Sequence, residues 1–312
     1  MSCTPSVAVS RRGALGRRLG GFVALTKPRI IELLLVTTLP TMIVADRRIP
    51  SIWLMLATLA GGALSAGGAN AANMFIDRDI DAIMKRTQRR PLVTGIVRPA
   101  EALVFSIALE AAAFVLLWLD VNLLSAALAL AAALFYVFVY SLFLKRRSSQ
   151  NIVIGGAAGA VPVLIGWTAV TDHLAWAPVV LFALIVIWTP SHFWALAVKY
   201  RDDYSAAHVP MLPSVASFER VAGEIIVYSV ALLGVSVLFA FVARMGAIYW
   251  VVAVAGGLVY VAYAIRLRLA GSGKSVGAGA TSQAALQLFK YSISYLTLLF
   301  VAMAVDVLVH IH

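Results

Sequence analysis

The sequence is poor in cysteine and in acidic residues, and both shortages exclude classes of protein. Its one cysteine, Cys3, allows neither an internal disulfide nor a metal site built from cysteines. Only 14 of the 312 residues are acidic, and charged residues of both signs make up 12%. Hydrophobic residues make up 62%, and the mean hydropathy is +0.93. So much apolar surface indicates a polytopic membrane protein rather than a soluble domain.

The first 26 residues lack the features of a secretory signal peptide. They contain four arginines and several serines, no acidic residue, and no apolar core followed by a cleavage site. We interpret residues 1–26 as a basic cytoplasmic tail, and residues 27–312 as the transmembrane domain of a protein of the bacterial inner membrane. An organellar transit peptide is the alternative, which would place the chain in the mitochondrial inner membrane.

Nine apolar stretches reach the length of about 20 residues that is needed to cross the hydrocarbon core of a bilayer. The fold class predicted is therefore an all-α membrane protein with nine transmembrane helices. Glycine-rich runs at residues 61–68 and 155–159 predict that the second and fifth of these helices pack closely against their neighbours. The nine stretches are 28–45, 51–76, 100–119, 122–144, 151–170, 174–198, 219–243, 247–267 and 289–309.

The basic residues are distributed unevenly between the connections. Three of the 25, Arg47, Arg48 and Arg244, fall on one side of the membrane, and the other twenty-two fall on the side of the N-terminus. Because basic residues accumulate in cytoplasmic connections, the N-terminus is predicted inside and the C-terminus outside. Topology thus accounts for most of the net charge of +11, and nucleic acid is not expected as a partner.

The densest group of acidic residues lies at the inner end of the second apolar stretch. Asn73, Asp77 and Asp81 recur at every fourth position, which on a helix stacks them along one face, whereas Asp79 points elsewhere. Oxygen ligands in such a row suit Mg²⁺, and the basic run Lys85–Arg90 adds groups that bind phosphates. The pattern predicts a metal–diphosphate site; the alternative is a solvated helix end with ion pairs four residues apart.

A second polar cluster, Trp188–Tyr204, follows the sixth stretch on the same side of the membrane. In it, Asp203 can complete a second Mg²⁺ position and Lys199 can reach a phosphate, or the two can form a simple intrahelical ion pair. His192 lies in an apolar helix beside Pro190. It can contact a flat macrocycle, or it can be a packing histidine bonded to a carbonyl that the proline leaves free.

Two polar clusters at one face of an apolar body fit a substrate with a diphosphate head and a long hydrocarbon tail. Mg²⁺ and basic side chains would stabilise the leaving diphosphate, and a water-poor cavity would protect the allylic cation until an acceptor captures it. The reaction predicted is prenyl transfer. A transporter is the rival class, but its intramembrane charges would line a pathway, and nothing comparable lies at the opposite face.

From Leu25 onward the chain resembles the UbiA-type intramembrane prenyltransferases. Residues Asn73–Asp81 match the first Asn-x-x-x-Asp-x-x-x-Asp motif of that family. The segments Gln150–Gly159, Trp188–Leu196 and Val209–Pro213 are similar to its haem-farnesylating branch. The first motif specifies the superfamily, and the later segments narrow the acceptor.

The resemblance implies nine helices around a central cavity, with farnesyl diphosphate and haem B as substrates and Mg²⁺ as the cofactor. A haem vinyl group would capture the farnesyl cation and water would add, giving haem O for haem–copper oxidases. An aromatic acid or quinone precursor is the alternative acceptor. Haem A synthase or an oxidase-assembly protein is the class of protein partner that the resemblance suggests, beside membrane lipid.

The resemblance also implies roles for individual residues. The metal ligands would be Asn73, Asp77 and Asp81, which together with Lys199 and Asp203 form the candidate catalytic set. The candidates for binding the diphosphate are Arg29, Arg78, Lys85, Arg86, Arg90, Lys145 and Arg146. His192 becomes a candidate for contacting haem. The chain departs from many superfamily members in having Lys199 where they have an aspartate, so a second Mg²⁺ is not implied.

Overall fold

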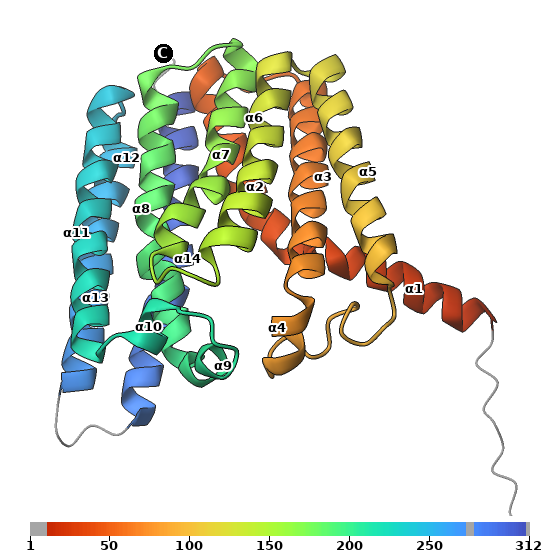
Figure 1. The fold of residues 1–312 in the computed structure, drawn as a ribbon. Coiled ribbons are helices and arrows are strands. Elements are labelled where there is room, and N and C mark those ends of the chain that lie inside the picture. The colour runs from red at the N-terminus through yellow and green to blue at the C-terminus, as the bar shows by residue number, and fades with distance from the viewer. Residues whose placement is uncertain (1–10, 273–277, 310–312) are drawn as a thin grey trace, which may run out of the picture.

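The computed structural model is a bundle of long helices, and it contains no strand within the residues that it describes, 11–272 and 278–309 (Figure 1). At residues 11–14, 29–35, 272 and 278 it describes the backbone alone. The long helices are α2 (Pro28–Asp46), α3 (Ile52–Ile76), α5 (Pro99–Asp120), α6 (Leu123–Leu134) continued by the π-helix η1 (Phe135–Leu144), α7 (Asn151–Thr171), α8 (Trp176–Lys199), α11 (Phe218–Val242), α12 (Ala247–Val251) continued by η2 (Val252–Gly256) and α13 (Gly257–Ser272), and α14 (Ala278–Val309). The short ones are α1 (Arg11–Leu25), α4 (Arg78–Ile83), α9 (Arg201–Ala206) and α10 (Leu212–Val215).

The prediction of nine spans agrees with this architecture. In the described part, eight helices are long and apolar enough to cross a membrane, and α2 occupies the place of the first predicted span. Most bounds agree within about two residues. The exceptions are α13 and α14, which extend on the inner side to Ser272 and from Ala278. These extensions carry polar residues such as Arg268 and Gln283, so their hydropathy does not reveal that the helices continue.

The long helices form a closed ring. Each packs against the next along the chain, and α14 packs against α2, while α2 also contacts α7 and α8 contacts α14 across the ring. Helices are the expected solution here, because backbone groups in hydrocarbon must find their hydrogen bonds within the segment. The short helices α4, α9 and α10 lie at one end of the bundle (Figure 1). This places the two polar clusters at the same end, as predicted.

The two glycine-rich helices pack as closely as the sequence predicts. A Cβ atom at Gly68 of α3 would lie 3.0 Å from the backbone oxygen of Ser106 on α5. At Gly166 of α7 it would lie 2.8 Å from the backbone oxygen of Thr38 on α2. At Gly166 no side chain fits without a shift of the backbone, and at Gly68 the neighbouring backbone would have to move by a few tenths of an ångström, so glycine is what lets these backbones approach.

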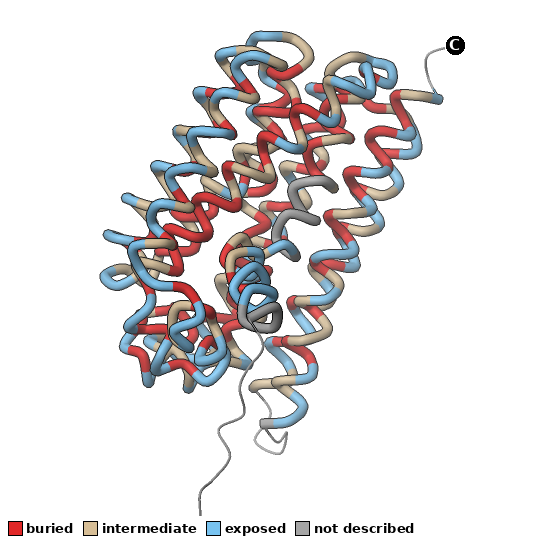
Figure 2. Tube along the Cα trace, turned by 90° about the vertical axis from the view of Figure 1, so that its right-hand side faces the viewer, coloured by how far each residue is buried: buried red, intermediate tan, exposed pale blue. Residues whose placement is uncertain are grey.

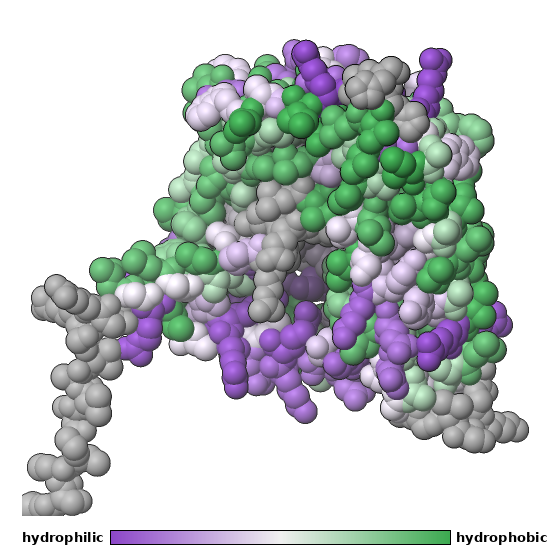
Figure 3. Space-filling model, turned by 180° about the vertical axis from the view of Figure 1, so that it is seen from behind, coloured by the Kyte–Doolittle hydropathy of each residue, from purple (hydrophilic) through white to green (hydrophobic). Residues whose placement is uncertain are grey.

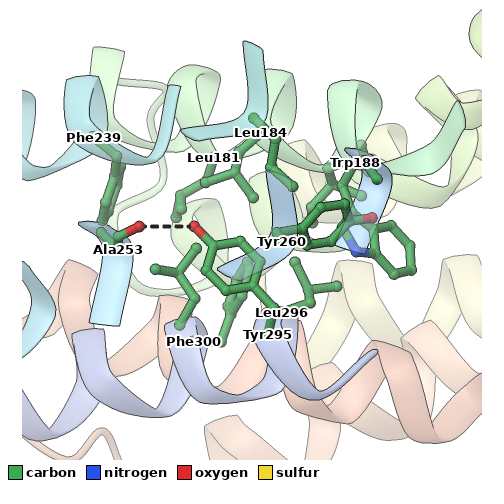
Figure 4. Close-up of a cluster of buried hydrophobic side chains, with 14 of the residues drawn as sticks. Leu181, Leu184, Trp188, Phe239, Ala253, Tyr260, Tyr295, Leu296 and Phe300 are labelled. Atoms are coloured by element: carbon green, nitrogen blue, oxygen red, sulfur yellow. Dashed lines mark hydrogen bonds between the residues drawn. The ribbon is translucent and has the colours of Figure 1, made fainter. Parts of the chain in front are cut away.

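Burial follows the inward faces of the ring, and the outward faces are exposed (Figure 2). A cluster of aromatic and aliphatic side chains fills the space between α8, α11, α13 and α14, with Phe239, Tyr260, Tyr295 and Phe300 each at most 1% exposed (Figure 4). The Tyr295 hydroxyl donates to the Ala253 carbonyl (3.3 Å), so its polar end is satisfied within the apolar cluster. The cluster fills the middle of this half of the bundle, and the main cavity lies in the other half.

Asp306, an intramembrane carboxylate, has a structural partner. It is 1% exposed on α14 and accepts hydrogen bonds from the backbone N–H groups of Gly246, Ile248 (3.1 Å) and Tyr249 (3.3 Å). These amides begin α12 and have no acceptor within their own helix. The carboxylate therefore satisfies a helix N-terminus and complements its dipole.

We expect Asp306→Ala to lower the thermal unfolding temperature of the detergent-solubilised protein. The substitution leaves three amides without acceptors, and a buried unsatisfied group costs about 1–3 kcal/mol. Asp306→Asn keeps one acceptor oxygen and should lose less. An unchanged unfolding temperature in Asp306→Ala would contradict the capping role.

Candidate active site

A cavity of about 400 Å³ lies in the open half of the bundle, between α3, η1, α7 and α8. Its lining changes in character with depth. Near α4 and α9 it is lined by the cationic side chains of Lys27, Arg86, Arg90 and Lys145. Deeper in the bundle it is lined by small and apolar residues of α3, α6, α7 and α8. The cavity is thus positively charged at its polar end and apolar within.

The predicted acidic row lies at this cationic end. Asp77 ends α3 and precedes α4, and hydrogen bonds from the Asp77 amide to the Asn73 carbonyl (2.9 Å) and from the Asp81 amide to the Asp77 carbonyl (2.8 Å) keep the helical spacing across the junction. The Asn73 side-chain amide also donates to Asp77 Oδ2 (2.7 Å). All three side chains are buried, Asp77 completely. The structure therefore brings Asn73, Asp77 and Asp81 together.

Each member of the row is bonded to a cation from another segment. Lys145, at the end of η1, donates to Asp77 Oδ2. Arg90 donates to Asp81 Oδ2 (2.6 Å). Lys27, which precedes α2, donates to Asn73 Oδ1 (2.9 Å). The carboxylates are thus neutralised by side chains that also face the cavity.

The donor set of this row fits a divalent cation that arrives with a phosphate ligand. Asp77 Oδ1 is buried and has no hydrogen-bond partner, so one carboxylate oxygen is unoccupied at the centre of the row. In the described part of the chain no three His, Cys, Asp or Glu side chains cluster as a complete metal site. Asn73, Asp77 and Asp81 supply a few oxygen ligands, and Mg²⁺ commonly takes the remainder from water and phosphate.

Lys27 is the residue of this site that the sequence analysis did not assign. It adopts a left-handed conformation (φ 51°) before Pro28, which turns the chain from α1 into α2. Burial, with Arg90 and Lys145 nearby, lowers the pKa of Lys27 from 10.5 to about 7. The sequence does contain a signal for it, because Lys27 directly precedes a proline at the start of an apolar stretch, at the same membrane face as the acidic row.

A π-helix forms the wall beside the row. In η1 the backbone bonds span five residues, as in the bond from the Lys145 amide to the Tyr140 carbonyl (2.8 Å). The wide turn places Tyr136 and Tyr140 on the cavity side, with their rings stacked at 5.3 Å. Ser141 accepts from Asn73 (3.0 Å). Such π-segments occur frequently at functional sites, and the hydrophobic pattern of the sequence does not distinguish them from α-helix.

The two polar connections meet over the mouth of the cavity. Arg86 donates to the Tyr204 hydroxyl (3.3 Å) and lies over the rings of Tyr200 and Tyr204, at 5.6 and 5.8 Å from their centres. Beside them, Ile80 and Met84 pack against Val209 in a buried apolar cluster. The α4 and α9 segments therefore form one cap.

Other predicted phosphate-binding residues lie outside the cavity. Arg146 forms two bonds of 2.7 Å with Asp79, and this pairing lowers the pKa of the Asp79 carboxyl to about 2. Arg78 donates to the Phe75 carbonyl (2.7 Å) and is exposed, as is Lys85. Arg29 lies outside the residues whose side chains the structure describes.

The second predicted pair is separated from the acidic row. Lys199 is exposed at the end of α8 and lines a different hollow, with Arg201, Thr281 and Ser282 among its neighbours. Its ammonium lies 5.7 Å from the centre of the Tyr200 ring. Asp203 is half-buried on α9. Neither residue is among those that line the main cavity.

His192 lies in the seam between α8 and α14. Its ring stacks between those of Trp188 (4.2 Å) and Phe289 (4.6 Å), and its Nδ1 is 2.6 Å from the Ser292 hydroxyl. It is 8% exposed, whereas Trp188 and Phe193 beside it line the cavity. Aromatic surface next to His192, rather than the imidazole, faces the open space.

The chain is similar to proteins of one family along nearly its whole length. The model of the UbiA prenyltransferase family matches residues 34–305. A protein of Streptomyces avermitilis named protoheme IX farnesyltransferase is 53% identical over 93% of this chain and 94% of its own length. A protein of Paenarthrobacter aurescens with the same name is 50% identical over 97% of this chain and 94% of its own length.

Solved structures of low sequence identity share the fold. A digeranylgeranylglyceryl phosphate synthase matches with a TM-score of 0.75 at 17% identity, covering 93% of this chain and 99% of the other. A UbiA homologue from Archaeoglobus fulgidus, solved with GPP and Mg²⁺, matches with a TM-score of 0.61 at 15% identity, covering 88% and 99%.

We expect the binding of inorganic diphosphate with Mg²⁺ to weaken as the pH rises above 7. The pKa of Lys27 is lowered to about 7, so the free protein loses this charge as the pH rises, and the anion needs it. The affinity should fall by up to about tenfold per pH unit above that value. Lys27→Arg, which stays charged, should remove this part of the slope.

Isothermal titration of both proteins across this pH range provides the measurement. The ionisation of the diphosphate itself contributes equally to the wild-type protein and to Lys27→Arg. The difference between their pH slopes therefore gives the contribution of Lys27. Identical slopes would contradict the assignment of Lys27 to the anion site.

Proposed function

The chain belongs to the UbiA prenyltransferase family, and we propose that it transfers the farnesyl group of farnesyl diphosphate to a vinyl group of haem B in a Mg²⁺-dependent reaction, giving haem O. The observation that carries the proposal is the cavity, which has Asn73, Asp81 and four basic side chains at one end and mostly apolar walls beyond. The choice of haem as acceptor is supported by relatives about half identical to this chain that are named protoheme IX farnesyltransferase.

The cationic end of the cavity suits the diphosphate head. Four positive side chains face the cavity there, whereas Asp81 is the one acidic residue among its lining residues. This excess of positive charge is balanced when a multiply charged anion enters. Lys145 and Arg90 would then exchange their carboxylate partners for phosphate oxygens, and arginine can bind them through two bonds. Arg86, held against Tyr204, would close over the same head group.

Asn73, Asp77 and Asp81 are the residues that would hold the metal. When bound there, Mg²⁺ supplies Lewis-acid stabilisation of the departing diphosphate. Burial prepares the carboxylates for binding a metal ion, because Lys145 and Arg90 are the main partners of their charges. The free Oδ1 of Asp77 is the oxygen that can coordinate without first losing a hydrogen bond.

In the proposed reaction the bond between farnesyl C1 and the diphosphate oxygen breaks, and its electron pair leaves with the diphosphate. The π electrons of the haem vinyl group then form a bond from its terminal carbon to C1. Water adds to the remaining carbocation and loses a proton, which completes the hydroxyethylfarnesyl group. Charge stabilisation by Lys27, Arg90 and Lys145 is directed at the diphosphate, where negative charge accumulates in the transition state.

The walls of the cavity support this order of events. The rings of Tyr136 and Tyr140 lie beside the acidic row, where an allylic cation would form, and aromatic faces stabilise cations. The apolar interior excludes water that would otherwise quench the cation. The volume of about 400 Å³ lies within the range of about 300–1,000 Å³ that is typical of small-molecule sites.

On the acceptor side we assign Trp188 and Phe193 to contacts with the haem ring, because both are aromatic and line the cavity. His192, stacked on Trp188, remains our candidate for a haem contact that a small shift of its ring would complete. Lys199 and Asp203 remain candidates at the second motif. Lys85, Arg78, Arg29 and Arg146 remain candidates for attracting the diphosphate from the outer part of the mouth.

We place the protein in the bacterial inner membrane, with the N-terminus and the cap formed by α4 and α9 on the cytoplasmic side. The uneven distribution of basic residues supports this orientation. Its product would supply haem–copper oxidases, so haem A synthase and oxidase-assembly proteins are the partners that we propose.

The test of the reaction is a product assay. Membranes that contain the protein would be incubated with haem B, farnesyl diphosphate and Mg²⁺, and the extracted haems separated by chromatography and mass spectrometry. We expect a more hydrophobic haem, heavier by a farnesyl group plus water, that is absent when EDTA is added. Unchanged haem together with release of diphosphate would move the acceptor to an aromatic acid or quinone precursor.

Substitutions in the acidic row test the site separately. Asp77→Asn and Asp81→Asn should reduce the rate by at least about 100-fold while the protein still inserts into the membrane, because each removes a carboxylate ligand of the Mg²⁺ that would stabilise the departing diphosphate. Asp79→Asn is the matched control. It lies in the same motif but points outward to Arg146, so it should keep most of the activity. Equal losses in all three variants would contradict the proposed site.

A further inference from the structure

Helix α1 carries an apolar strip that no described part of the protein covers. Leu15, Leu19 and Val23 are exposed by 61%, 59% and 58%. Their spacing of four residues places them along one face of the helix. A contiguous apolar strip of this kind, unlike a single exposed leucine, indicates a surface that something else covers.

The other side of α1 fixes how this strip is oriented. Leu25 is completely buried in a cluster with Met74 and Val97. A Cβ atom at Gly21 would lie 2.8 Å from the side chain of Ile96, so the helix backbone sits directly on the segment after α4. Arg18 donates to Glu101 at the start of α5 (2.7 Å). The C-terminal half of α1 is therefore docked, and its exposed strip faces a defined direction.

That direction is toward the apolar belt of the bundle, by which we mean the outward-facing apolar surface of the membrane-length helices. In Figure 1, α1 projects sideways from the polar end of the bundle, across the direction of the long helices. In the space-filling view of Figure 3 this projecting arm is hydrophobic on the side that faces the apolar belt and hydrophilic on the side that faces the polar end. Arg17, which is exposed, lies on the helix about 160° from Leu15.

We propose that α1 lies in the interfacial layer of the bilayer, with Leu15, Leu19 and Val23 among the acyl chains and Arg17 among the headgroup phosphates. The occupant of the strip is lipid, because the long helices require a bilayer around the belt that the strip faces. A helix with one apolar and one basic side is the form that binds in this layer. The basic side complements the phosphate groups of the headgroups.

The position of α1 also connects this surface to the active site. The helix ends at Leu25, and Lys27, bonded to Asn73, follows two residues later. Lipid contact along the strip would therefore hold the segment that carries Lys27, in addition to the contacts made by Leu25 and Arg18 within the protein.

Spin labels at single positions test the proposal in the full-length protein. In a Cys3→Ser background, which leaves no other cysteine, the label would be placed at Leu19→Cys or at Ala24→Cys. Both positions are exposed, but Ala24 lies about 140° around the helix from Leu19. The protein would be reconstituted in vesicles of phosphatidylcholine and phosphatidylglycerol. Collision rates would be measured with oxygen, which concentrates in lipid, and with a water-soluble nickel chelate.

We expect the ratio of oxygen to nickel collisions to be severalfold higher at position 19 than at position 24. Val23→Cys, on the same strip, should repeat the result of position 19 and guards against a local disturbance. Equal ratios with high nickel access at both positions would overturn the proposal, since the strip would lie in water. Low access of both reagents at position 19 would overturn it as well, because protein rather than lipid would cover the strip.

Discussion

Two buried carboxylates and the cations that they attract hold the polar end of the bundle together. Asp77 and Asp81 are almost completely buried, and each is bonded to one cation, Lys145 or Arg90. Removing one partner of such a pair costs about 3–5 kcal/mol, because a buried charge is left without compensation. The three segments that meet here, the end of α3, the end of η1 and the connection after α4, are therefore positioned by charge.

The same pairing prepares the site for the chemistry that we propose. Lys27, Arg90 and Lys145 are held close together near a negative row, although burial, and to a lesser extent the charges of Arg90 and Lys145, lower the pKa of Lys27. A diphosphate with its metal ion would give the basic side chains phosphate oxygens and the carboxylates a divalent cation as partners. Substrate binding would therefore exchange ion pairs rather than create charge in an apolar cavity. The free oxygen on Asp77 gives this exchange a starting point.

Much of this structure is predictable from the sequence, and the parts that are not predictable have physical reasons. Spans are predicted well because hydropathy and length alone decide them, and the row at Asn73 is predicted because helical spacing is local. The partners of the row are not local: Lys145 reaches Asp77 from 68 residues away, and Lys27 reaches Asn73 from 46. The sequence did not predict helix α1, because its arginines suggested a tail and its apolar strip consists of only three residues.

The placement of His192 shows a second limit. Its neighbours in the sequence allow either a histidine that contacts a ligand or one that packs between helices. In the structure the ring is stacked between Trp188 and Phe289, and Phe289 comes from a helix almost one hundred residues later. Which side of α8 faces the cavity is decided by how α14 packs against it. Periodicity within α8 cannot supply that information, because the helix is apolar around most of its circumference.

The most direct test of the account is to observe the metal between the acidic row and the diphosphate. Mn²⁺ would replace Mg²⁺, together with a farnesyl thiodiphosphate that reacts slowly, and electron–nuclear double resonance would detect coupling between the manganese and phosphorus nuclei. We predict phosphorus coupling in the wild-type protein and its loss in Asp77→Asn. Bound manganese without phosphorus coupling, or coupling that persists in this variant, would contradict the central claim.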